Sequence, residues 1–84
     1  MATRLATGKV TRLYANHQGA FIRLKYEGTK PKDNYFFLPI DQVNYNSMFS
    51  LATVATVNKY NLNIGVKEEA IDSETIAHVY YLFF

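Results

Sequence analysis

The stretch that decides the fold spans residues 8–24 and reads GKVTRLYANHQGAFIRL. It indicates two short strands, 9–14 and 20–26, joined by a polar turn that ends in Gly19. Alternate side chains of a strand point to opposite faces of a sheet. In the second strand the apolar set is Ala20, Ile22 and Leu24, and the opposite set is Phe21, Arg23 and Lys25. The pattern therefore predicts a β-hairpin with one face in the core and, on its other face, an aromatic ring beside two cations.

The rest of the chain predicts more short strands and no strong helix. Further strands are expected at 35–38, 51–60, 64–67 and 76–84. Residues 51–60 are rich in threonine and valine, which favours a strand, although their apolar spacing of three also fits one face of a helix. The polar segments 27–34 and 68–75 are expected to be loops. Five or six short strands of this kind predict an all-β domain, folded as a small barrel that spans residues 1–84.

Length and composition limit what the chain can be. Its 84 residues suit one small domain, and 49% of them are apolar, which favours a folded chain. There is no cysteine, so disulfides and thiolate metal sites are excluded. The longest apolar run, 79–84, is far shorter than the roughly 20 residues that cross a bilayer. With no signal-like run near residue 1, a cytoplasmic location is expected.

Charge is distributed unevenly, although the formal net charge is only +2. Residues 1–32 hold seven of the nine lysines and arginines and one acidic residue, Glu27. Residues 33–84 hold the other two cations and six acidic residues. Such polarity is compatible with a basic face and an acidic back, and equally with chance clustering on a solvated surface.

Three short motifs give the chain a resemblance to a known family. In order they are Gly8-Lys9-Val10, Gly19-Ala20-Phe21-Ile22 and Tyr35-Phe36-Phe37-Leu38. This succession resembles the S1-type RNA-binding domain and the cold-shock domain, both of which have the OB-fold. The resemblance implies a five-stranded barrel that binds single-stranded RNA or DNA with low sequence preference and no cofactor.

The resemblance also implies which residues would form the binding face. Arg12, Gly19 and Leu38 stand where cold-shock domains carry a tryptophan, an aromatic residue and a histidine, so the aromatic platform is reduced. Stacking is expected from Phe21 and Phe36, and the nearby cations would contact phosphate or base edges. The candidate nucleic-acid-binding residues are Lys9, Arg12, Tyr14, Phe21, Arg23, Lys25 and Phe36.

The same resemblance also implies which of two adjacent phenylalanine rings faces the core. Phe36 and Phe37 cannot both face the core of a regular strand. The resemblance places Phe37 inside, with Tyr35, and Phe36 outside, with Leu38.

Two other classes of function remain open. Both sides of the apolar run 79–84 are hydrophobic, so one side could meet a protein partner or a second copy of the chain. A third interpretation is an SH3-like barrel that binds a peptide or protein.

A metal site would need partners for His17 or His78 at suitable spacing, and none is present. No constellation of nucleophile, base and oxyanion donor appears either, so we expect a binding module and not an enzyme.

Overall fold

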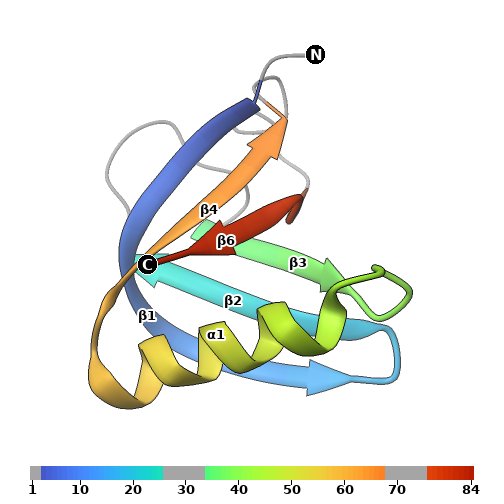
Figure 1. The fold of residues 1–84 in the computed structure, drawn as a ribbon, viewed down its shortest axis with the longest axis horizontal. Coiled ribbons are helices and arrows are strands. Elements are labelled where there is room, and N and C mark those ends of the chain that lie inside the picture. The colour runs from blue at the N-terminus through green and yellow to red at the C-terminus, as the bar shows by residue number, and fades with distance from the viewer. Residues whose placement is uncertain (1–2, 26–33, 68–75) are drawn as a thin grey trace.

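The computed structural model describes residues 3–25, 34–67 and 76–84. The predicted loop at 68–75, and all but the last residue of the loop at 27–34, lie outside the described residues. The described elements are β1 (Thr3–Asn16), β2 (Gly19–Lys25), β3 (Tyr35–Pro39), α1 (Tyr45–Asn58), β4 (Asn61–Lys67), β5 (Ala77–His78) and β6 (Tyr81–Phe83). Six strands form one curled, barrel-like sheet in the order β5-β3-β2-β1-β4-β6, and one helix lies against it (Figure 1).

The predicted hairpin of β1 and β2 is confirmed, and its first strand is longer than expected. β1 pairs along one half with β2 and along the other half with β4. The turn is closed by the Asn16 side chain, whose Oδ1 accepts a hydrogen bond of 2.8 Å from the Gln18 backbone N–H. Gly19 has φ +150°, and a Cβ there would run into the Leu38 carbonyl of β3. The glycine at the end of the turn is thus required by both backbone angle and space.

The expectation of one continuous strand at 76–84 is wrong. β5 pairs parallel with β3, whereas β6 pairs antiparallel with β4. Between them the Val79 N–H donates to the Phe37 carbonyl at 2.9 Å, and the next N–H, of Tyr80, donates to the Gly65 carbonyl at 2.8 Å. Consecutive residues therefore bond to β3 and β4, which are second from the two ends of the sheet order. This segment thus brings the two sides of the curled sheet together.

The prediction of a strand at 51–60 is also wrong, because residues 45–58 form α1. Its buried residues, Met48, Ala52 and Ala55, recur at spacings of four and three and so share one helical face. Two alanines let the helix lie close to the sheet. Burial of this face outweighs the weak helix propensity of the threonines and valines on the remaining surface.

The end of α1 is fixed by its backbone. Lys59 has φ 58° and ψ 36°, a left-handed conformation, and its N–H donates to the Ala55 carbonyl. The Tyr60 N–H reaches the same carbonyl at 3.1 Å. The Lys9 ammonium of β1 donates to the Lys59 carbonyl at 2.9 Å, which places a cation at the negative end of the helix.

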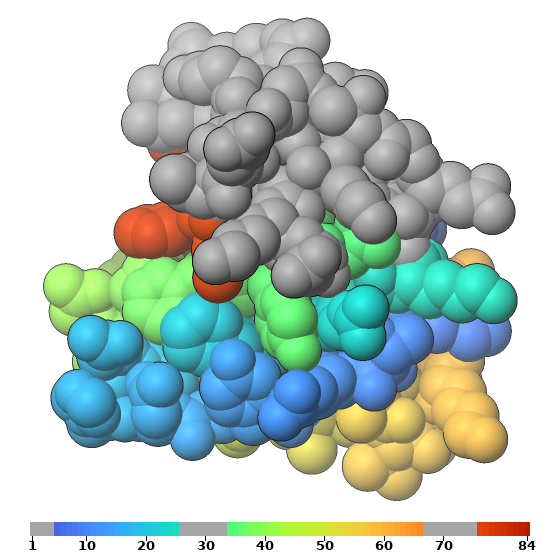
Figure 2. Space-filling view, turned by 180° about the vertical axis from the view of Figure 1, so that it is seen from behind, coloured from blue at the N-terminus to red at the C-terminus, as the bar shows by residue number. Residues whose placement is uncertain are grey.

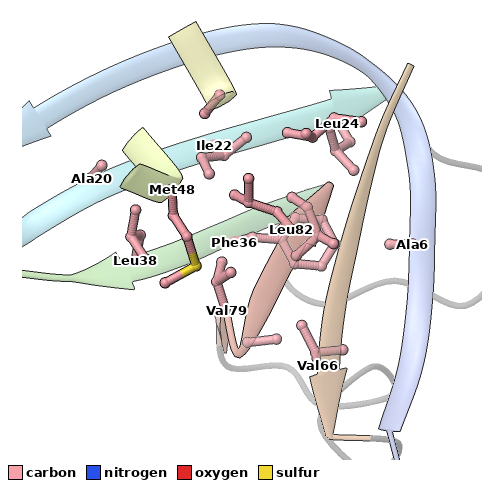
Figure 3. Packing of buried hydrophobic residues seen from close by; sticks show 14 of the residues in the cluster. Ala6, Ala20, Ile22, Leu24, Phe36, Leu38, Met48, Val66, Val79 and Leu82 are labelled. Carbon is pink, nitrogen blue, oxygen red and sulfur yellow. The ribbon is translucent and has the colours of Figure 1, made fainter. Parts of the chain in front are cut away.

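One hydrophobic core fills the space between the curled sheet and α1. Figure 3 shows β2 side chains pointing into it, with Met48 of α1 and Leu82 of β6 opposite. The predicted inward set of Ala20, Ile22 and Leu24 is confirmed, since all three are buried. The largest fully buried side chains are Phe36, Ile22, Leu24, Leu38, Leu62, Ile64, Val66 and Val79.

Candidate functional site

A row of rings crosses the outer face of the sheet. Strand register pairs Tyr14 of β1 with Phe21 of β2, Phe21 with Phe37 of β3, and Phe37 with His78 of β5. Cross-strand partners point to the same side of a sheet. Four side chains from four strands thus form one continuous line, which we call the aromatic row. Figure 2 faces this side of the molecule, where blue atoms of β1, cyan atoms of β2 and green atoms of β3 lie next to one another.

The rings of the aromatic row contact one another. The centroids of Tyr14 and Phe21 are 5.1 Å apart with planes at 13°, and those of Phe21 and Phe37 are 4.9 Å apart at 38°. His78 meets Phe37 edge-on at 5.2 Å. At these separations each ring partly covers the face of the next, so a ligand meets ring edges and the uncovered parts of the faces. Tyr14, at one end, remains 39% exposed.

A second row, two residues farther along β2 from the turn, carries cations. Register pairs Arg12 with Arg23, and Arg23 with Tyr35. The Arg12 guanidinium carbon lies 5.0 Å from the Tyr14 ring centroid, and that of Arg23 lies 5.8 Å from the Tyr35 centroid. Arg12 Nη1 also donates to the Tyr35 hydroxyl at 3.4 Å. These contacts hold both guanidinium groups, which we call the arginine pair, beside the aromatic row.

The two predicted lysines lie beyond the arginine pair. Lys25 is exposed at the end of β2 and is the register partner of Lys9. The Lys9 ammonium is held by the Lys59 carbonyl, and its distance to Asn61 Oδ1 is 3.4 Å. Lys25 therefore lies next to the arginine pair on the outer face, whereas Lys9 is directed toward the end of α1.

The predicted orientation of Phe36 and Phe37 is wrong. Phe36 is fully buried in the core, and Phe37 lies on the outer face in the aromatic row. The cause is strand register: Phe36 is opposite Ile22, which is a core residue, and Phe37 is opposite Phe21. Phe36 thus cannot stack on a ligand, and the second ring of the site comes from Phe37.

Sequence reasoning missed three residues of this face. Tyr35 and Phe37 share one side of β3, and only the register of β3 against β2 shows that this side faces outward. His78 joins the aromatic row only because β5 pairs with β3 across a long separation in the chain, for which the sequence offers no local signal. His17 lies exposed in the turn between β1 and β2.

A small hollow of about 200 Å³ lies beside the arginine pair. It is lined by Thr11, Arg23, Leu24, Lys25 and Asn34. The register of β1 against β2 shifts between Val10 and Arg12, so Thr11 is the extra residue of a β-bulge. The Thr11 hydroxyl donates to the Arg23 carbonyl at 3.3 Å, which ties the bulge to β2. Two of the cationic residues predicted from the sequence, Arg23 and Lys25, thus border the hollow.

The described parts of the chain contain neither a metal-ligand cluster nor a membrane-spanning helix. Within residues 3–25, 34–67 and 76–84, no group of three or more His, Asp or Glu side chains is placed to hold a metal ion. Across the same ranges, no helix has both the length and the apolar character needed to cross a bilayer. Comparison of the chain with protein-family models, with curated proteins and with solved structures found no match.

Proposed function

We propose that the outer face of β1, β2 and β3 binds single-stranded nucleic acid, RNA in the first place, with little sequence preference. The observation that carries this proposal is the alignment of the aromatic row with the arginine pair on one face. A single strand offers flat bases and a line of phosphates, and proteins that hold it combine aromatic side chains with cations. The two kinds of group are here separated by two residues along β2, which is about 7 Å.

The geometry suggests how each component contributes. Bases would lie on the uncovered parts of Tyr14, Phe21 and Phe37, meeting ring faces and edges, which are both favourable aromatic contacts. The guanidinium groups of Arg12 and Arg23 would contact phosphates or add stacking surface of their own. Base faces and phosphates are common to all nucleotides, so binding through them has low sequence preference.

We further propose that the fold is a five-stranded barrel of the OB type. In this interpretation β5 and β6 are two ends of one fifth strand, interrupted at Val79 and Tyr80. Support comes from the hydrogen bonds of these two residues to β3 and β4, and from the place of α1 in the chain between the same two strands. Amide hydrogen exchange tests this: slow exchange at Val79 and Tyr80 is expected, and free exchange at both would contradict closure.

A titration with a fluorescent eight-nucleotide RNA tests the proposed function. Saturable binding is expected at low salt, and it should weaken as salt rises. If Arg12, Arg23 and Lys25 each neutralise one phosphate, the slope of log affinity against log salt should be about −2. A duplex of the same sequence serves as the control, since its bases cannot reach the rings. Equal affinity for duplex and single strand would contradict binding through the aromatic row.

A second candidate function, self-association, is favoured by another aromatic surface. Tyr81 and Phe83 of β6 stack at 6.1 Å and are 41% and 42% exposed, and Leu5 of β1 is 44% exposed. Register places Leu5, Gly65 and Tyr81 in one line, and we call Leu5, Tyr81 and Phe83 the C-terminal aromatic patch. Light scattering after size exclusion tests it: a dimer that Phe83→Ser converts to monomer would support this function, and a wild-type monomer would exclude it.

A further inference from the structure

The hollow at the β-bulge has a chemistry distinct from that of the aromatic row. Its lining residues include Arg23, Lys25, Asn34 and Thr11, which carry two cationic side chains, an amide and a hydroxyl. Leu24, 1% exposed, contributes the apolar part of the wall. Two cations and several small polar groups suit an anion better than a base, which would need a flat apolar wall.

The hollow lies close enough to the aromatic row to receive a phosphate of a nucleic-acid strand bound there. Arg23 is two residues along β2 from Phe21, about 7 Å, and the hollow extends from Arg23 to Lys25. A sugar can span the gap between a base on the Phe21 ring and a phosphate beside Arg23. On the other side of the aromatic row β2 begins at Gly19, so within β2 itself the cations lie on one side of the row.

A terminal phosphate of a nucleic-acid strand carries more negative charge than an internal phosphate. A phosphate monoester carries about −1.5 to −2 at pH 7, whereas an internal phosphodiester carries a single charge. Two cationic residues in the lining of one hollow therefore favour the monoester. Its three unesterified oxygens can also accept several hydrogen bonds at once, which a single-charged phosphodiester offers less fully.

We propose that this hollow binds the terminal phosphate monoester of a nucleic-acid strand whose bases lie on the aromatic row. The inference rests on the proposed nucleic-acid function and adds an end preference to it. Because the strand would lie on the face in one polarity, the preference applies to one end, either the 5′ or the 3′.

The test compares three eight-nucleotide RNAs of one sequence, with a 5′-phosphate, a 3′-phosphate or hydroxyls at both ends. One phosphorylated RNA is expected to bind at least about fivefold more tightly than the hydroxyl form, equal to about 1 kcal/mol. Lys25→Gln should reduce that ratio to near one. Lys59→Gln, which removes the same charge from a residue that does not line the hollow, should preserve it. Equal affinity of the wild-type protein for all three RNAs would overturn the inference while leaving the proposed function intact.

A second measurement separates the two proposals if no RNA binds. Nuclear magnetic resonance with a ¹⁵N-labelled chain and inorganic phosphate should shift the amide signals of Thr11, Lys25 and Asn34 in a saturable way, and Lys25→Gln should weaken the effect. Such shifts without RNA binding would refute the nucleic-acid function, and with it the terminal-nucleotide ligand, but establish an anion site. The absence of both responses would refute both proposals.

Discussion

Phe21 and Phe37 face each other across β2 and β3, with ring centroids 4.9 Å apart on the outer side of the sheet. Each is flanked by a further ring, Tyr14 on one side and His78 on the other. The contact joins strands from two different parts of the chain into one surface. It also means that a ligand on this surface contacts several rings together.

Replacing Phe37 with alanine should weaken binding of single-stranded RNA. Stacking of one base on an aromatic side chain is worth about 1–3 kcal/mol, so we expect an affinity loss of about tenfold in an anisotropy titration. The matched control is Phe83→Ala, which removes an equally aromatic side chain from the C-terminal aromatic patch. Equal losses in both variants would show that the aromatic row is not the binding surface.

The neighbouring Phe36 should behave differently, because it is fully buried. Phe36→Ala leaves a cavity in the core, and such changes cost about 3–5 kcal/mol of stability. Urea unfolding should show a much lower midpoint than for Phe37→Ala, whose side chain is half-buried on the outer face. A smaller loss for Phe36→Ala than for Phe37→Ala would contradict the observed orientation of β3.

Two buried glycines should differ in their tolerance of alanine. At Gly19 a Cβ meets the backbone of Leu38 and φ is +150°, so neither obstacle can move away cheaply. At Gly65 the atoms nearest to a Cβ belong to the ring of Tyr81, a partly exposed side chain that can turn aside. We expect Gly19→Ala to cost about 1–3 kcal/mol and Gly65→Ala distinctly less. Thermal unfolding compares the two, and the reverse order would be inconsistent with this account of the turn.

Val57→Ala should stabilise the protein slightly. Val57 lies in α1 and is 74% exposed, so little packing is lost. Alanine is the better helix former, and the expected gain is about 0.5 kcal/mol in the free energy of unfolding. In a strand the same change would be unfavourable, because valine is the better strand former. A destabilised variant in urea unfolding would therefore contradict the helix.

The hairpin was predictable from the sequence because its signals agree with one another. Alternation in β2 assigns Ile22 to the core and Phe21 to the surface, and a glycine follows the polar turn. Local pattern and tertiary packing demand the same structure there.

The helix was not predictable with the same reliability. Residues 45–58 have no charged side chain and several β-branched ones, which favours a strand locally. Met48, Ala52 and Ala55 show the helical spacing, but alanine is a weak hydrophobic signal on its own. Burial against the sheet decides the outcome, and that information lies outside the segment.

The residues of the outer face of β1, β2 and β3 were predicted only in part, because some of them depend on the pairing of distant strands. Residues on β1 and β2 followed from alternation within one hairpin. The choice between Phe36 and Phe37 depended on register between β2 and β3, because two adjacent phenylalanines carry no internal signal. The break at Val79 and Tyr80 depended on which strands lie at the two ends of the sheet order, which no local pattern contains.

The central claim is that single-stranded nucleic acid binds on the aromatic row and the arginine pair. Amide chemical-shift mapping with an unlabelled eight-nucleotide RNA tests it most directly. We predict saturable shifts at Arg12, Tyr14, Phe21, Arg23 and Phe37, with little change at Tyr81 and Phe83. No saturable shifts at low salt, or shifts confined to the C-terminal aromatic patch, would contradict the claim.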